Sequence, residues 1–108
     1  GVATHRHTPE IEEQLGYAAG KEIVINFTPH LVPMNRGILA TEYATLNRKA
    51  DGSLPTYEEL KAAYDKYYAN EKFVRVLEKD VVPETKWVEG SNYVERRIES
   101  CSDVHVII

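Results

Sequence analysis

The segment 28–37, TPHLVPMNRG, constrains the fold of this chain more than any other stretch. Pro29 and Pro33 have no backbone N–H to donate, and each fixes its own φ at about −65°, so the segment cannot be a central strand of a sheet. Gly37 ends it with a residue that tolerates turn conformations. We therefore predict a shaped loop here, with separate elements on either side.

The sequence on both sides of this loop has the pattern of β-strands. Residues 21–27 alternate, with Ile23, Ile25 and Phe27 on one face, which is the period of a half-buried strand. After the loop, GILATEYATLN is rich in β-branched and aromatic residues and predicts a strand that begins near Gly37. Two strands joined through such a loop are most simply antiparallel neighbours.

Two helices are predicted from their boundary residues. Thr8 is a good N-cap, Pro9 suits the first helical position, and Gly20 supplies a stop. The second helix begins at a capping box, Thr56 with Glu59 three residues later, and keeps helical spacing through TYEELKAAYDKYYANE.

The remaining pattern completes the expected fold. Residues 48–55 have turn composition, and further strands are predicted around 72–78, 86–93 and 103–108. Strands interrupted by two helices, with hairpin-like connections, favour an α+β fold with a mainly antiparallel mixed sheet and helices packed on one face. The length of 108 residues suits a single domain, 1–108.

Composition narrows the class of protein. The net charge of −4, with Lys and Arg scattered among acids, argues against a nucleic-acid partner. No apolar run approaches the roughly 20 residues that cross a bilayer, so no membrane partner is expected. The single cysteine, Cys101, cannot form an internal disulfide, and a cytoplasmic location is the default. Glu99 and Asp103 flank this cysteine, so we expect an inert thiol.

The most suggestive polar cluster is His5-Arg6-His7, directly before the first helix. Exposed N–H groups and a partial positive charge already mark a helix N-terminus, so added cations there favour a bound anion. A polar surface turn is the plain alternative. A metal site is not expected, because His5 and His7 supply two ligands and only His30 offers a third. An acid/base or anion-orienting role fits histidine and arginine chemistry better.

A second candidate is Arg36, which stands with His30 and Asn35 in the loop 28–37. The prolines and glycine explain the shape of the loop without any function. A loop stiffened by two prolines also pre-organises the side chains that it presents, and Arg36 is the one best suited to an anion. Both interpretations stay open, and His30 receives no role beyond loop structure.

Three motifs carry a resemblance to a known family. HRHTPEIEEQL, followed after a spacer by FTPHLVPMNRGILAT, closely resembles N-acetyl-γ-glutamyl-phosphate reductase, an enzyme of arginine biosynthesis, within its second, substrate-side and dimerising domain. VEGSNYV, at 88–94, is also similar to that family. The resemblance runs from about Val2 to Tyr93. It implies a fold like the C-terminal domain of glyceraldehyde-3-phosphate dehydrogenase-like enzymes.

The resemblance also implies a chemistry. Members of the family use NADPH to reduce N-acetyl-glutamyl 5-phosphate to the semialdehyde with release of phosphate. A cysteine upstream of this segment attacks the acyl phosphate, and a histidine acts as acid/base. The histidine motif falls on His5-Arg6-His7, with His7 as the first candidate and His5 as the second. Arg6 and Arg36 are the candidates for substrate binding, and a homo-oligomer through the sheet is expected.

Several features depart from the family pattern. No G-x-G-x-x-G turn occurs, so the nucleotide-binding domain is missing from this chain, and the catalytic cysteine with its Gly-Cys context is missing too. Residues 95–108 do not follow the family sequence. The chain begins at Gly1 without a methionine, and we expect a piece of a larger two-domain reductase that is inactive alone.

Two other classes of function remain open. One is a non-catalytic α+β module that binds a small acidic metabolite at the start of the first helix. The other is a structural interaction domain, in which His5, Arg6 and His7 could be changed without effect on any ligand.

Overall fold

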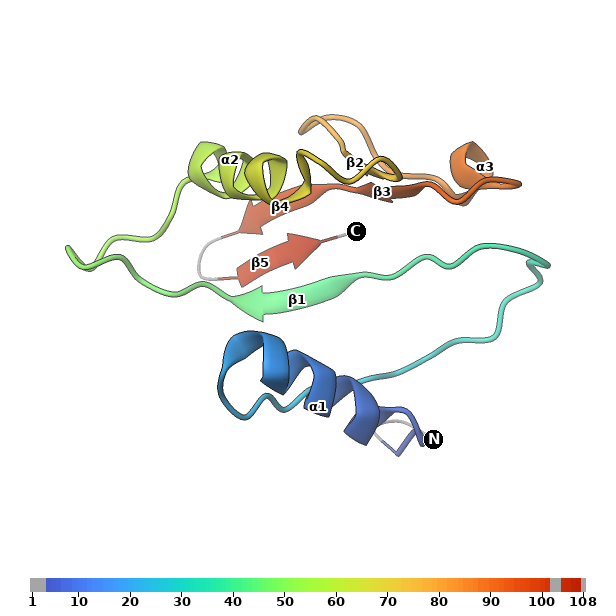
Figure 1. Ribbon diagram of the computed structural model, residues 1–108, viewed down its shortest axis with the longest axis horizontal. Helices are drawn as coiled ribbons and strands as arrows, with labels where there is room; N and C mark the ends of the chain where they lie inside the picture. The colour runs from blue at the N-terminus through green and yellow to red at the C-terminus, as the bar shows by residue number, and fades with distance from the viewer. Residues whose placement is uncertain (1–3, 102–103, 108) are drawn as a thin grey trace. The chain divides into compact units, whose positions relative to one another are not determined.

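The computed structural model describes the backbone of residues 4–101 and 104–107 and the side chains of residues 4–99 (Figure 1). The chain divides into two compact units, Gly1–Met34 and Asn35–Ile108, which are described separately here. The expectation of a single domain over 1–108 stays a prediction.

The first unit contains helix α1, Thr8–Ala19. Pro9 lies in its first turn, and the helix ends at Gly20, whose φ of 67° is the left-handed conformation that glycine adopts most easily. The predicted helix and its stop are confirmed. The N-cap, however, is His7 and not Thr8, and no side chain caps the helix there.

The segment that follows α1 keeps the predicted alternation without forming a strand. Ile23, Ile25 and Phe27 are half-buried, whereas the residues between them are exposed. The backbone N–H of Ile25 donates to the Oε1 atom of Glu12 on α1 at 3.0 Å, and no ladder of strand hydrogen bonds involves 21–27 in the described part of the chain. A strand requires a neighbouring strand, so the predicted strand and its antiparallel pairing are wrong.

The second unit begins with extended chain and a short strand. The proline-containing segment 28–37, which bridges the two units in the sequence, has no regular structure, as predicted. Strand β1 is confined to Glu42–Thr45 and so begins later than expected. It pairs in antiparallel fashion with β5, Val104–Ile107, which places Tyr43 opposite Val106.

Helix α2, Tyr57–Tyr68, has the predicted capping box. The Thr56 hydroxyl accepts from the Glu59 N–H at 3.2 Å, and the Glu59 carboxylate accepts from the Thr56 N–H at 2.8 Å. Each side chain thus satisfies a backbone donor that the first helical turn leaves free. The helix contacts two strands, β2, Val74–Val76, and β4, Ile98–Cys101.

Two small sheets complete the second unit. One has the order β1-β5-β4 and is antiparallel. The other consists of β2 and β3, Val94–Arg96, which run parallel. The connection between these parallel strands contains the short helix α3, Thr85–Val88, within the region 86–93 where a strand was predicted. Figure 1 shows β3 leading directly into β4, with only Arg97 between them.

The predicted fold class, a mainly antiparallel mixed sheet with helices packed on one face, is therefore wrong. The described strands form two separate sheets, and the β2-β3 sheet is entirely parallel. Parallel neighbours need a crossover connection, and α3 with the left-handed turn at Gly90, φ 73°, occupies that connection instead of another strand. The likeness to glyceraldehyde-3-phosphate dehydrogenase-like domains holds only at the level of the sequence family reported below.

The core is small. Ile98 on β4 is fully buried, and among the described residues it is the one large apolar side chain with no exposed surface. Several others are largely exposed, including Val24 at 80%, Ile38 at 88% and Tyr43 at 73%. No helix in the described residues has the length and apolar character needed to cross a membrane.

Candidate functional site

The three cationic candidates of the first unit lie in one tight turn at the start of α1. The Thr8 N–H donates to the His5 carbonyl at 3.0 Å, and the Ile11 N–H donates to the His7 carbonyl at 2.9 Å. Because His7 is the N-cap, its side chain and that of Arg6 stand at the positive end of the helix, as the sequence predicts.

The His5 side chain is held by a hydrogen bond to one ring nitrogen and by contacts of the ring itself. Its Nδ1 atom accepts a hydrogen bond from the His7 backbone N–H at 3.2 Å. Its ring lies edge-on to Phe27, with centroids 5.3 Å apart, and to His7 at 4.9 Å. An accepting Nδ1 means that the neutral ring carries its proton on Nε2.

His7 and Arg6 differ from His5 in that neither side chain holds the turn by a hydrogen bond to the described residues, although the His7 ring contacts that of His5. Both are exposed, and neither side chain has a hydrogen-bond or ion-pair partner among residues 4–99. The ring nitrogens of His7 therefore make no hydrogen bond to residues 4–99. The Arg6 guanidinium can accept an incoming carboxylate or phosphate in bidentate fashion.

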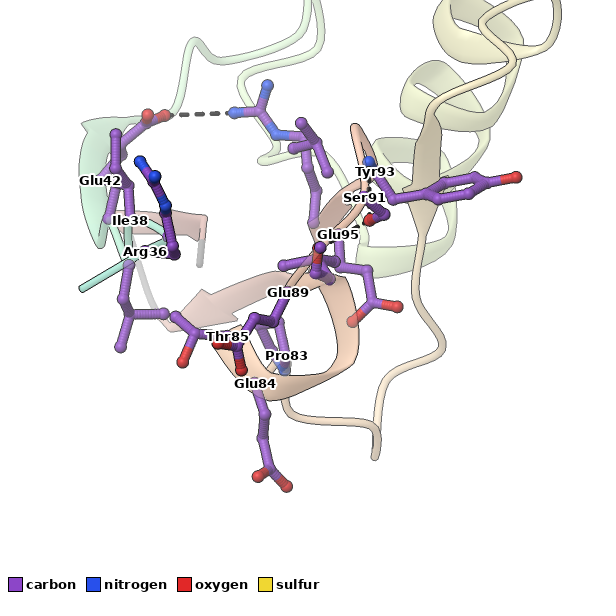
Figure 2. Close-up of a pocket in the computed structure, with 17 residues that line it drawn as sticks. Arg36, Ile38, Glu42, Pro83, Glu84, Thr85, Glu89, Ser91, Tyr93 and Glu95 are labelled. Atoms are coloured by element: carbon purple, nitrogen blue, oxygen red, sulfur yellow. Dashed lines mark hydrogen bonds and ion pairs between the residues drawn. The ribbon is translucent and has the colours of Figure 1, made fainter. Parts of the chain in front are cut away.

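The second unit contains a cavity of about 610 Å³ that Arg36 lines (Figure 2). Its wall is built from the extended chain before β1, from α3 and its flanking residues, and from β3. Apolar side chains form much of it, among them Ile38, Leu39, Val88 and Val94. Figure 2 shows Arg36 and Ile38 on one side and Ser91 and Glu95 on the other.

Most charged groups in the cavity wall already have partners. Arg96 bonds Glu42 at 3.3 Å, which Figure 2 marks with a dashed line, and the Oε1 atom of Glu95 bonds Arg75 at 2.8 Å. Glu84 bonds Lys86. Of the cavity's charged side chains, Arg36 and Glu89 alone have no partner in the part of the chain that the structure describes.

Arg96 also ties three elements together. Its guanidinium donates to the Tyr68 hydroxyl at 2.8 Å, and its Cζ atom lies 5.7 Å and 5.8 Å from the ring centroids of Tyr68 and Tyr64. Burial raises the pKa of Tyr64, while the Arg96 charge opposes that shift. Through Arg96, helix α2 is linked to β1 and β3 at the edge of the cavity.

Ser91 shapes the turn after α3. Its hydroxyl donates to the Val88 carbonyl at 2.6 Å and accepts from the Tyr93 N–H at 3.1 Å. The Tyr93 ring packs against Phe73 at 5.5 Å and under Arg75 at 4.3 Å. The motif at 88–94 thus builds one wall of the cavity and anchors it to β2.

The structure places the predicted site residues in two groups. His5, Arg6 and His7 share one turn of the first unit, and Arg36 lies in the cavity of the second. His30 is exposed. No cluster of three or more His, Cys, Asp or Glu side chains within the described residues could hold a metal ion. The side chain of Cys101 lies outside the described ones, so its expected inertness stays a prediction.

Sequence reasoning missed Glu95 and Arg96 as cavity residues. Glu95 meets Arg75 through the register of β2 and β3, whereas Arg96 meets Tyr68 of α2 and Glu42 of β1 through the packing of separate elements. The one available signal was the VEGSNYV motif, which directly precedes them.

Comparison with known proteins decides the family. All of residues 1–108 match the sequence family described as "Semialdehyde dehydrogenase, dimerisation domain". The chain belongs to this family. The identification agrees with the resemblance carried by the sequence motifs.

Several similar curated proteins are named N-acetyl-gamma-glutamyl-phosphate reductase. The protein from Lachnospira eligens is 68% identical over 96 residues, which cover 88% of this chain and 26% of the relative. That from Lachnoclostridium phytofermentans is 60% identical over 95 residues, covering 88% and 26%. That from Moorella thermoacetica is 55% identical over 92 residues, covering 85% and 25%. The chain thus spans about a quarter of the length of these relatives.

Proposed function

We propose that the full-length protein carrying this chain is an N-acetyl-γ-glutamyl-phosphate reductase, and that this chain is part of its substrate-side, dimerising domain. The observation that carries the proposal is the 68% identity over 96 residues to a protein of that name. The reaction reduces N-acetyl-glutamyl 5-phosphate to the 5-semialdehyde with release of phosphate, a step in arginine biosynthesis. The protein is proposed to be cytoplasmic. It is also proposed to be homo-oligomeric, which is in keeping with the family's description as a dimerisation domain.

NADPH is the proposed reductant, and it would supply the hydride. The residues of this chain do not fit the cofactor, because a dinucleotide needs a glycine-rich turn between a strand and a helix. His-Arg-His precedes α1, and a proline-containing turn precedes α2. We assign NADPH to a nucleotide-binding domain elsewhere in the full-length protein, together with the cysteine nucleophile.

His7 is the proposed acid/base residue, with His5 as the second candidate. The ring nitrogens of His7, which have no hydrogen-bond partner among residues 4–99, support this order, since the Nδ1 atom of His5 already holds the turn. A histidine suits the role because its ordinary pKa lies near neutrality, so that it can accept a proton from a thiol and return one to an oxygen.

Arg6 and Arg36 are the proposed substrate contacts. Both are exposed guanidinium groups without a partner in the described residues, and each can bind a carboxylate or phosphate oxygen pair. This chain by itself is expected to be inactive, because the proposed cysteine nucleophile and the proposed NADPH site lie elsewhere in the full-length protein.

The deciding experiment is an assay of the purified full-length protein for NADPH oxidation that depends on N-acetyl-glutamyl phosphate. The wild type should be active, and His7→Asn should lower kcat by about 100-fold or more while NADPH affinity changes little. Wild-type turnover in His7→Asn would remove the histidine from the mechanism. An inactive wild type that still binds N-acetylglutamate would favour the non-catalytic binding module instead.

A further inference from the structure

The exposed turn 48–53 contains a chemically labile pair of residues. Asp51 is followed by Gly52, and it is the one aspartate of the chain that precedes a glycine. Glycine has no Cβ, so its backbone nitrogen is more open to a neighbouring carboxyl group than that of other residues. Attack of this nitrogen on the Asp51 Cγ atom forms an N–C bond and releases water, which gives a cyclic succinimide. Addition of water then opens the ring to aspartate or to isoaspartate, in which the backbone runs through the side chain.

The conformation of the turn requires the glycine. Gly52 has a φ of 83°, which lies in the left-handed region where a residue with a Cβ is strained. Its N–H donates to the Lys49 carbonyl at 2.9 Å, and the Lys49 N–H donates to the Ser53 carbonyl at 2.8 Å. The Nη1 atom of Arg48 donates to the Gly52 carbonyl at 2.9 Å. The labile pair therefore belongs to a turn that is closed by several hydrogen bonds.

Hydrogen bonds also hold the two groups that would react. The Oδ1 atom of Asp51 accepts from the Ser53 hydroxyl at 2.6 Å and from the Ser53 N–H at 2.9 Å, and both bonds lower the pKa of Asp51. They keep the carboxyl group ionised, whereas release of water requires its protonated form. The Gly52 nitrogen must lose its proton to attack, and the Lys49 carbonyl holds that proton. Both groups must leave their native hydrogen bonds before the ring can form.

We propose that Asp51 is a site of isoaspartate modification, and that the native turn protects it by holding its carboxylate on Ser53 and the Gly52 N–H on Lys49. Isoaspartate would add a methylene to the backbone of this turn. The Lys49 ammonium bonds the Glu59 carboxylate of the α2 capping box at 3.0 Å, so the protection also preserves the start of α2. The proposal does not depend on the catalytic activity of the full-length protein.

The test measures isoaspartate formation in the purified full-length protein during incubation at neutral pH. After digestion, chromatography separates the isomeric peptides, and electron-transfer fragmentation assigns the isoaspartate to its position. The native wild type should form isoaspartate at Asp51 about tenfold more slowly than the same protein unfolded in urea, because the native turn must first open. Asp80 is the internal control, since the β-branched Val81 follows it, and it should form little isoaspartate in either state.

Variants of Ser53 separate the turn from the dipeptide itself. Ser53→Ala removes the hydroxyl that donates to Asp51 and should raise the native rate by about threefold or more, the usual effect of one lost hydrogen bond. Ser53→Thr is the matched control, because it keeps a hydroxyl and should react as slowly as the wild type. In urea, where the turn is absent, all three proteins should react at similar rates.

Four outcomes would overturn the proposal. These are equal rates in the native and unfolded wild type, a Ser53→Ala variant as slow as the wild type, a Ser53→Thr variant as fast as Ser53→Ala, and a Ser53→Ala variant that reacts faster than the wild type in urea as well. Circular dichroism checks that each variant is folded. If either variant fails to fold, the comparison of native and unfolded wild type still decides.

Discussion

His5 and His7 are two positions apart, but their rings have different surroundings. The Nδ1 atom of His5 accepts the His7 N–H, and its ring lies against Phe27, whereas the His7 ring is exposed. An Nδ1 atom that accepts a backbone N–H uses its lone pair for that hydrogen bond. The same residue type therefore holds the turn at one position and presents an exposed ring at the other.

This difference predicts separable effects of substitution at His5. Asparagine can place its Oδ1 atom near the position of Nδ1, so His5→Asn should keep the turn and lose little stability. His5→Leu should lower the free energy of unfolding by about 1 kcal/mol, because the His7 N–H loses its acceptor. Urea denaturation of the two variants measures the difference, and equal stability of both would show that the hydrogen bond contributes nothing.

Arg96 provides a prediction about the edge of the cavity. Arg96→Met removes the bonds to Tyr68 and Glu42 and should lower the free energy of unfolding by about 1–3 kcal/mol. Lys66→Met is the matched control, since Lys66 is exposed on α2 and its change should stay within about 0.5 kcal/mol. Chemical denaturation followed by circular dichroism compares the two, and similar losses in both would contradict the assigned role.

Among the helices and strands, α2 has the N-terminus that the local sequence specifies most completely. Thr56→Ala removes the hydroxyl that accepts the Glu59 N–H and should cost about 1 kcal/mol of stability. Thr56→Ser keeps an equivalent hydroxyl and should cost much less. Thermal unfolding of both variants checks this. A serine variant as unstable as the alanine variant would mean that packing of the threonine methyl, and not the cap, sets the stability of the helix start.

The same capping box makes α2 sensitive to acid. The Thr56 N–H, followed by the Lys49 ammonium, lowers the pKa of Glu59 below its ordinary value of 4.5. A lowered pKa in the folded state means that the stabilisation is complete above pH 4.5 and is lost as the pH falls through the folded-state value. Glu59→Gln should therefore flatten the loss of stability between neutral and acidic pH. A pH series of unfolding midpoints tests this, and an unchanged slope would contradict it.

At the scale of the whole molecule, the exposed apolar surface and the family description both favour association between copies of the chain. Tyr43 is 73% exposed on β1, an edge strand of the three-stranded sheet. Unpaired strand edges favour association with another chain. For a protein of a dimerisation-domain family, this edge is a reasonable contact between copies.

Tyr43→Asp should accordingly weaken the proposed homo-oligomer of the full-length protein. A charge placed in an apolar contact loses solvation without gaining a partner. Tyr67→Asp is the control, because Tyr67 is similarly exposed, at 79%, but lies on α2 and not on the strand. Sedimentation velocity over a range of concentrations measures the effect, and dissociation by Tyr67→Asp alone would place the contact on the helix.

The features predicted correctly from the sequence are local ones. Both helices, the stop at Gly20, the capping box at Thr56 and the irregular segment 28–37 depend on residues within a few positions of one another. The turn at Asp51 is also local. The Asp51 carboxylate accepts hydrogen bonds from the Ser53 N–H at 2.9 Å and from the Ser53 hydroxyl at 2.6 Å. These hydrogen bonds lower the pKa of Asp51. The motifs also indicated the family, because their order and spacing are carried by the chain itself.

Tertiary structure alone decided which strands exist and how they pair. Residues 21–27 alternate in burial as a strand would, but a strand needs a partner that no local pattern can supply. The cavity has the same origin: the parallel register of β2 and β3 sets Arg75 opposite Glu95, and the chain before β1 adds Arg36 to the wall. Residues distant in sequence meet only when the chain folds, so sequence motifs named the histidines and Arg36, whereas folding alone revealed Glu95.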